Sequence, residues 1–327
     1  MTFPMALTIQ KLYDIMLEVG RKNDPRSKKE IDAQLKEQKD AYDKLDKKKK
    51  AFFDKERTTN PYLDARVLYG DGKRKVKTAM VCIDSDKYEV MLANELRKNG
   101  TPVDMVISHH PEGRALIDLT RVMHVQNDIM ESYGVSPNIS EKLLGKRVGK
   151  LNRGLHPINH YQHVDAARLL DVPYMTCHTP ADNSVHNFFL DFVKKGEKKW
   201  NKVSDFMDAL LEIPELAEGE RLGMGPMIFA GSPTSKLGKI AVTGMTGGTS
   251  GSEDIFEQLS RAGVGTVVSM HMGEAPREKA EKYHLNVVIT GHMASDSIGM
   301  NLVMDHMEKA GLKIIPAGGF IREKRKV

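Results

Sequence analysis

Histidines recur directly after the expected strands of this 327-residue sequence. Five of its 12 histidines occupy such positions, and two aspartates follow them closely along the chain; these residues are His109, His110, His178, His271, His292, Asp182 and Asp296. Neutral imidazole and carboxylate are ligands of zinc, iron, manganese and nickel. A single histidine after a strand more often completes a turn, but the repeated placement predicts one shared metal site.

The spacing of these residues fits two ions better than one. His109 and His110 are adjacent, and Pro111 restricts the backbone before it, so that both rings can turn into one cavity. Two cations roughly 3.5–4 Å apart repel each other unless an anion lies between them. We expect Asp182 to be that bridging carboxylate. His292 and Asp296 are four residues apart and share a helix face, although Asp296 alone could simply complement a helix N-terminus.

The expected elements alternate between short β-branched runs and amphipathic helices. The runs that matter for the site are residues 76–83, 103–108, 174–177, 265–270 and 287–290. This alternation predicts an α/β fold with a mainly parallel sheet. Ligands of such sheets bind beyond the carboxyl ends of the strands, which is where the histidines stand.

Three short motifs resemble the Nif-three-like (Ngg-interacting factor three-like) family of dinuclear metal-centre proteins. In that family an HH pair, an HTxxD motif and a GHxxxE motif supply the ligands. This chain has SHHPEG at 108–113, HTPADN at 178–183 and GHMASD at 291–296, and the resemblance covers residues 61–327. Aspartate replaces the last glutamate, which predicts unequal occupancy of two sites. The family's N-terminal Trp-Asp segment is replaced by NPYLDAR at 60–66.

The resemblance implies a Nif-three-like fold with two α/β lobes, at about 61–200 and 220–327, around a mainly parallel sheet. It also implies a hexameric ring with two divalent metal ions per subunit facing its interior, their identity open among zinc, iron, manganese and nickel. The implied ligands are His109, His110, Asp182, His292 and Asp296. His178 would lie beside them or contact a substrate.

The leading functional hypothesis is a metal-dependent hydrolase of a small-molecule substrate, with metal-activated water. The family carries a GTP-cyclohydrolase-like label, but its physiological reaction is generally unsettled. His178 and Glu112 are the candidates for proton transfer. The alternative is a non-catalytic metal-binding scaffold, chaperone or partner-recruiting ring, since the sequence contains the metal cluster without a recognisable nucleophile.

A charged segment at 22–58 precedes the α/β pattern and predicts an inserted helical arm. Residues 21–57 contain 14 Lys and Arg against 9 Asp and Glu, which accounts for the whole net charge of +5. Apolar residues at alternating four- and three-residue steps form one narrow seam (Ile31, Leu35, Tyr42, Leu45, Phe52). A solvated or partner-packing arm, acting as a lid or an oligomer clasp, is favoured over a nucleic-acid contact through residues 47–50.

Several signals bear on location and on weaker sites. No apolar run approaches a membrane span, residues 1–20 lack a signal-peptide core, and Cys82 and Cys177 lie in apolar runs, so we expect a cytoplasmic protein with reduced thiols. The glycine-rich run 244–251 could be a tight turn or an anion cradle. The roles of His156, His160, His163 and His271 stay open between a further ion and ordinary surface or cavity positions.

Overall fold

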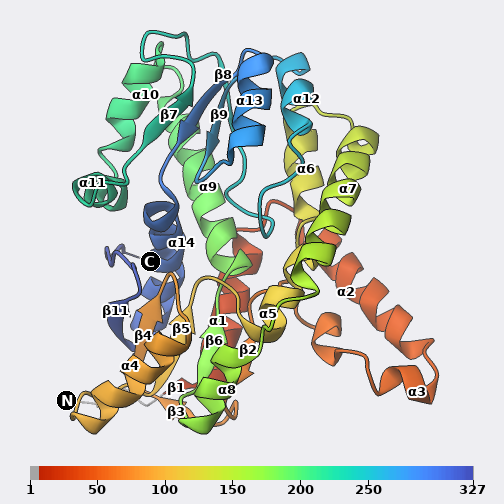
Figure 1. The fold of residues 1–327 in the computed structure, drawn as a ribbon, viewed down its shortest axis with the longest axis vertical. Helices are drawn as coiled ribbons and strands as arrows, with labels where there is room; N and C mark the ends of the chain where they lie inside the picture. Colours follow the sequence, from red (N-terminus) through yellow and green to blue (C-terminus); the bar gives the residue numbers. More distant parts are fainter. Residues whose placement is uncertain (1–6, 327) are drawn as a thin grey trace.

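The computed structural model describes residues 7–326, and the start of the segment examined for a signal peptide lies outside that range. Two main sheets stand one above the other in Figure 1. The five-stranded sheet has the order β11-β4-β5-β6-β2, formed by Lys313–Ala317, Thr78–Cys82, Met105–Ser108, Tyr174–Thr176 and Val67–Tyr69. The four-stranded sheet has the order β7-β10-β9-β8, formed by Met227–Ala230, Asn286–Ile289, Val264–Ser269 and Lys239–Val242. A short antiparallel pair joins β1 (Leu7–Thr8) to β3 (Lys75–Val76).

Both main sheets are parallel except for one antiparallel edge strand each, β2 and β7. Every residue of β4, β5 and β6 is buried. Strands covered on both faces need continuous apolar runs, which is why these segments do not alternate in polarity. The predicted α/β fold with a mainly parallel sheet is confirmed.

Helices cover the sheets and connect their strands (Figure 1). They are α1 (Ile9–Lys22), α2 (Lys28–Asp43), α3 (Lys47–Lys50), α4 (Lys87–Lys98), α5 (Gly113–Ile117), α6 (Val125–Ser132), α7 (Pro137–Leu155), α8 (Gln162–Leu169), α9 (Thr179–Gly196), α10 (Val203–Leu210), α11 (Pro214–Arg221), α12 (Ile255–Arg261), α13 (Glu274–Lys282) and α14 (His292–Lys309), with 3-10 turns η1 (Lys55–Thr58) and η2 (Leu119–Arg121). Among residues 7–326, no helix has the length and apolar character to traverse a membrane.

Helix α14 ties the two sheets together. It follows β10 of the four-stranded sheet and leads into β11, which pairs with β4 of the five-stranded sheet. Its residues Met300, Val303 and Met304 pack in the core beside the five-stranded sheet. Ala294 and Ile298 pack in the core beside the four-stranded sheet. The division into lobes at 61–200 and 220–327 stays a prediction, and the topology adds that the chain returns to the first sheet after 312.

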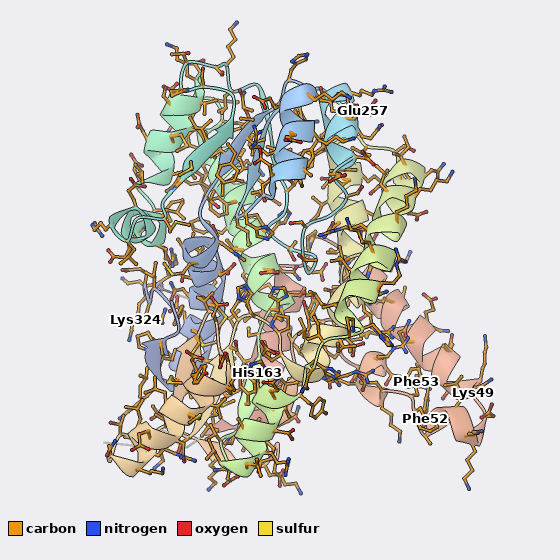
Figure 2. All side chains as sticks on the ribbon, in the orientation of Figure 1. Lys49, Phe52, Phe53, His163, Glu257 and Lys324 are labelled. Carbon is orange, nitrogen blue, oxygen red and sulfur yellow. The ribbon has the colours of Figure 1, made fainter. Side chains whose placement is uncertain are left out.

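The charged segment forms a helical arm that projects from the body (Figure 1). Its helix ends at Asp43, and a second short helix begins only at Lys47. This break shifts the phase of the predicted seam. Ile31 is buried, but Phe52 is 84% exposed at the outer end of the arm (Figure 2), and it is Phe53 that packs on Tyr42, with ring centroids 5.1 Å apart.

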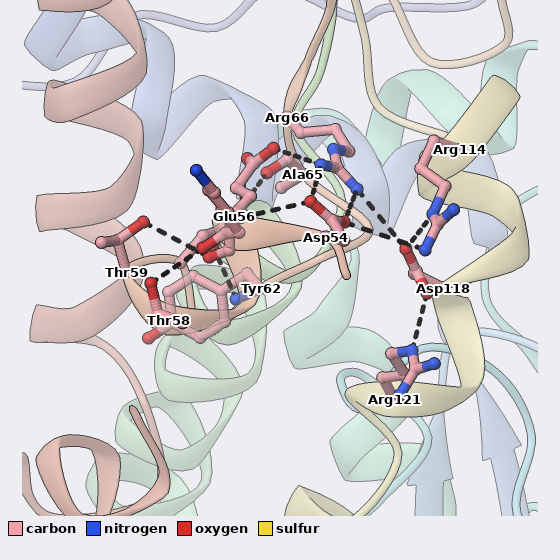
Figure 3. Close-up of polar contacts among 12 residues, drawn as sticks. Asp54, Glu56, Thr58, Thr59, Tyr62, Ala65, Arg66, Arg114, Asp118 and Arg121 are labelled. Atoms are coloured by element: carbon pink, nitrogen blue, oxygen red, sulfur yellow. Dashed lines mark hydrogen bonds and ion pairs between the residues drawn. The ribbon is translucent and has the colours of Figure 1, made fainter. Parts of the chain in front are cut away.

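An ion-pair network anchors the returning part of the arm to the body (Figure 3). The Arg66 guanidinium donates to Glu56 and lies 2.9 Å from an Asp54 carboxylate oxygen and 3.4 Å from one of Asp118. Asp118 is buried and also accepts from Arg114 and Arg121. Because both Arg66 and Asp118 are largely removed from water, each needs its partners to offset the lost hydration.

We predict that Arg66→Met lowers the free energy of unfolding by about 3–5 kcal/mol, because it leaves buried carboxylates without their shared cation. Urea unfolding of the variant and of wild type measures this. Arg221→Met is the matched control, since Arg221 is 70% exposed and its exposed pairs contribute about 1 kcal/mol or less. Equal losses from the two substitutions would contradict this account of the network.

Candidate metal centre

The five-stranded sheet aligns three strand ends at one edge. Cys82, Ser108 and Thr176 stand side by side in parallel register. Their backbone ladder continues past the strands, where the His109 N–H donates to the Cys82 carbonyl at 2.8 Å. His109, His110 and His178 therefore leave the sheet at the same height, which brings their rings within 4.9–5.9 Å of one another, centroid to centroid.

The four-stranded sheet supplies the opposite wall through α14. Gly291 links β10 to this helix with φ +93°, and a Cβ there would lie 2.8 Å from the Met224 carbonyl oxygen. Only glycine adopts such a conformation at this close approach without strain. The turn sets His292 as the first residue of α14, and Asp296 follows one turn later on the same face.

Helices α9 and α14 approach each other closely beside the site. A Cβ on Gly299 would lie 2.3 Å from the Ala181 carbonyl oxygen, so the helix axes could not come this near with a larger residue. Asp182 is adjacent to Ala181, and Asp296 lies one turn before Gly299. This close contact places the carboxylates of Asp182 on α9 and Asp296 on α14 next to the histidines that follow the strands of the five-stranded sheet.

Asp296 lies between two sets of imidazoles. Its Oδ1 is 3.4 Å from His109 Nε2, and its Oδ2 is 3.5 Å from His110 Nε2 and 3.3 Å from His292 Nε2. Both oxygens are buried, and neither has a hydrogen-bond partner within the described part of the chain. A carboxylate so placed can offer one oxygen to each of two cations.

Asp182 occupies a more lateral position than the sequence led us to expect. Its Oδ1 is 3.4 Å from His109 Nε2 and its Oδ2 is 3.7 Å from His178 Nε2. It shares a potential ligand group with His109 and Asp296, whereas Asp296 also belongs to the group with His110 and His292. The distances therefore favour Asp296 over Asp182 for the bridging position, because α14 carries Asp296 into the centre of the cluster.

Two further aspartates orient the histidines, and neither was among the sequence-predicted site residues. Asp64 Oδ2 is 2.8 Å from His178 Nδ1 and also accepts from the Thr179 hydroxyl at 2.7 Å. Asp84 Oδ1 is 2.7 Å from His110 Nδ1. Each carboxylate favours the tautomer with a proton on Nδ1, which leaves Nε2 free to bind. Asp84 comes shortly after β4, as His109 comes after β5. This position after a strand is the sequence feature that could have identified Asp84 as a site residue.

The cluster fits divalent cations by its chemistry. Buried polar atoms are normally hydrogen-bonded, yet His109 Nε2, Asp182 Oδ1 and both Asp296 oxygens have no such partner among residues 7–326. His109 Nε2 lies 3.4 Å from both Asp182 Oδ1 and Asp296 Oδ1, a separation that suits ligands around a cation. Imidazoles and carboxylates at these positions could hold a metal ion.

Burial and charge set opposite protonation tendencies across the site. Burial raises the pKa of Asp182 to about 8. Burial opposes protonation of His178, but the Asp182 and Asp64 carboxylates outweigh it and raise the pKa of His178 to about 9. Loss of hydration lowers the pKa of His292 to about 4. Burial alone would raise the pKa of Asp296, but the surrounding imidazoles, His109 first, lower it well below its usual value.

A solvent-connected cavity of about 850 Å³ opens onto the cluster. His110, His178, Asp182 and His292 line it together with Glu112 and His271. Glu112 is engaged by His163, whose Nδ1 is 2.6 Å from Glu112 Oε2 (His163 is labelled in Figure 2). His271 lies against His292, with ring centroids 4.6 Å apart.

The two histidines left open near α8 stand apart from this cluster. His156 is exposed after α7, and His160 contacts Tyr161, with ring centroids 5.3 Å apart. Within the part of the chain that the structure describes, the potential metal groups contain neither of them. They occupy an outer loop rather than a strand end, which explains the difference.

The glycine-rich run 244–251 forms a packed turn beside the cavity. A Cβ on Gly247 would lie 2.7 Å from the Gln126 side chain, and one on Gly248 would lie 2.8 Å from the Leu119 carbonyl oxygen. The Gln126 amide donates to the carbonyls of Gly247 and Thr249, each at 2.7 Å. These contacts favour the tight turn over the anion cradle, since the glycines serve close packing against α6 and η2.

Comparisons with known proteins establish the fold. No family model matches the sequence, and no curated protein matches it. The chain is similar to a solved NIF3 superfamily protein from Sphaerobacter thermophilus, with a TM-score of 0.76 and 24% identity over 96% of this chain and 100% of that one. Reduced HcgD from Methanocaldococcus jannaschii (TM-score 0.49, 14% identity, 77% and 88% covered) and a Bacillus cereus protein related to NIF3 (0.42, 12%, 77% and 90%) also match.

The chain therefore has the fold of a NIF3 superfamily protein, and the predicted resemblance is confirmed at the level of the fold. The similarity extends over nearly the whole chain. The motifs that led to the resemblance lie at the strand ends and helix starts of this fold.

We predict that the metal-free protein loses stability as pH rises from 7 to 8.5. The adjacent His178 and Asp182 together hold a proton in the folded state that their unfolded counterparts release, because their folded pKa values of about 9 and 8 exceed the ordinary values. Stability present at lower pH is then lost at up to about 1.4 kcal/mol per pH unit for the pair, since the Asp182 carboxylate is itself what raises the pKa of His178. Urea unfolding at several pH values measures the slope. Saturating divalent cation should flatten it, and a metal-free stability that rises over this window would contradict the assignment.

Proposed function

We propose that this chain is a dinuclear metal protein that hydrolyses a small-molecule substrate. The observation that carries the proposal is the position of Asp296, whose two buried oxygens face two different sets of potential ligands. One site consists of His109, Asp182 and Asp296. The other consists of His110, His292 and the second oxygen of Asp296. Three protein ligands at each site leave room for water or substrate, as catalytic metal sites require.

A pair of divalent cations held there would supply Lewis acidity and lower the pKa of water toward 7. The remaining work falls to side chains on the cavity wall. Asp64 fixes the His178 ring through Nδ1, so that Nε2 faces Asp182 and the cavity. His178 can therefore hold or deliver a proton at Nε2. Glu112, the other candidate for proton transfer, is less available because it is paired with His163.

The cavity favours catalysis over the scaffold alternative. A storage or scaffolding site needs a closed ligand shell, whereas this cluster borders a cavity with about 320 Å³ of accessible space, within the range of small-molecule sites. A hexameric ring in the cytoplasm, with zinc, iron, manganese or nickel as the native metal, remains part of the proposal. The similarity to the NIF3 superfamily protein supports the fold on which that wider assignment rests.

Substitution of the two aspartates should remove different numbers of ions. We expect Asp296→Asn to lose both cations, because it weakens the carboxylate common to both sites, and Asp182→Asn to retain about one per chain. Elemental analysis after dialysis against trace chelator measures the content. Asp165→Asn, a change at an exposed aspartate that pairs with Arg168, is the control and should bind as wild type does. Equal retention in all three variants would remove the bridging role.

Catalysis is tested by screening metal-reconstituted protein against ester, amide, amidine and phosphoester substrates. We expect turnover that needs added metal and falls at least a hundredfold in His178→Gln with metal content unchanged. Such a result separates proton transfer from metal binding. Retained metal with no turnover on any substrate, together with transfer of the ion to an acceptor protein, would favour the scaffold alternative instead.

A further inference from the structure

A second hollow lies on the other side of the glycine-rich turn, among α6, α7, α12 and the end of β9. It has about 70 Å³ of accessible space, within an empty region of about 730 Å³ that includes open solvent. In Figure 1, α6 and α7 run beside α12 on the flank of the four-stranded sheet. We call this hollow the side pocket.

The side pocket adjoins the metal cavity. Gly244, Thr246 and His271 line both hollows, and the turn 244–251 forms the wall between them. His271 stands at the junction, with its ring 4.6 Å from the His292 ring on one side and its Nδ1 3.3 Å from the Ser250 hydroxyl on the other. A ligand bound at the cluster therefore has a neighbouring space into which its remainder can extend.

The wall of the side pocket is uncharged and largely apolar. No Asp, Glu, Lys or Arg is among the described residues that line it. Its apolar side chains come from four helices (α6, α7, α12 and α13) and the loop after β9: Ile129, Met130, Leu143, Leu144, Ile255, Phe256, Met272 and Pro276. A charged ligand group would lose its hydration here without gaining an opposite charge, whereas an apolar group gains about 25 cal/mol per Å² buried.

Several polar side chains of the pocket are engaged within the protein. The Ser140 hydroxyl donates to Asn127 Oδ1 at 2.6 Å, and the Gln126 amide holds the glycine-rich turn. Their hydrogen bonds fix the shape of the wall rather than recognising a polar ligand. The chemistry thus selects against phosphate and carboxylate groups at this position.

We infer that the side pocket binds an uncharged aryl or alkyl group of the substrate, whose hydrolysable end lies at the metal cluster. This inference rests on the proposed function and narrows its substrate class to compounds with a neutral apolar portion beside the reacting bond. His271 then lies between the two parts and positions the ligand.

Binding to metal-free protein tests the pocket separately from the metal chemistry. With ¹³C-methyl methionine, NMR should show benzamide and 2-naphthamide shifting the Met130 and Met272 signals, which belong to the side pocket. Met91, an exposed methionine on α4, is the internal control and should not move. Acetamide, which lacks the apolar group, and benzoate, which is charged, should bind at least tenfold more weakly than benzamide. Absent shifts, or equal binding of benzoate, would overturn the inference.

Two substitutions provide the structural control. Leu143→Trp fills the side pocket from α7 and should weaken benzamide binding at least tenfold, whereas Ile139→Trp on the same helix, outside the lining, should not. If Leu143→Trp fails to fold, Met272→Glu places a charge in the wall and should have the same effect on neutral amides. Unchanged binding in the folded pocket variant would contradict the assignment.

Hydroxamates on metal-loaded protein then distinguish the two proposals. Acetohydroxamate reports the cations, and the gain in affinity of benzohydroxamate over acetohydroxamate, expected to be at least tenfold, reports the side pocket. Loss of that gain in Leu143→Trp, with acetohydroxamate binding intact, supports the inference. Amide binding without any hydroxamate binding would contradict the proposed metal centre but not the side pocket. Hydroxamate binding without the gain in affinity for benzohydroxamate would contradict the side pocket but not the metal centre.

Discussion

One buried carboxylate determines how the site is built. Among the residues described, neither oxygen of Asp296 has a hydrogen-bond partner, and burial of a carboxylate without one is costly. The neighbouring imidazoles lower the pKa of Asp296, so the carboxylate stays ionised and is stabilised by nearby positive charge. Cations between Asp296 and the histidines would supply that charge. They would also reduce the electrostatic repulsion between Asp296 and the nearby Asp182.

The scaffold around this carboxylate is shared by both sheets. Helix α14 leaves the four-stranded sheet, carries His292 and Asp296 past the strand ends of the five-stranded sheet, and then contributes β11 to that sheet. Gly299 permits the approach of α9, and Asp64 orients His178 from a segment two residues before Arg66. Because Arg66 also holds the base of the arm, the arm is connected to the residues that orient the site.

Much of the fold and of the cluster was predictable from the sequence, because parallel strands end at one edge and polar side chains after them must converge. The histidines at 109, 110, 178 and 292 came together for that reason. The central position of Asp296, with Asp182 to one side, was not predictable, since it depends on how closely α9 and α14 approach at Gly299. The side pocket was equally hidden, as its wall joins α6, α7 and α12 from distant parts of the chain. The prediction that Phe52 belongs to the apolar seam of the arm was wrong, because the helix ends at Asp43 and Phe52 is exposed.

The central claim is that two cations share the Asp296 carboxylate. Anomalous X-ray diffraction from crystals of manganese-loaded protein, collected at the metal absorption edge, tests it most directly. The account predicts two peaks roughly 3.5–4 Å apart, one beside each oxygen of Asp296. A single peak remote from Asp296, or no ordered metal at all in fully loaded crystals, would contradict it.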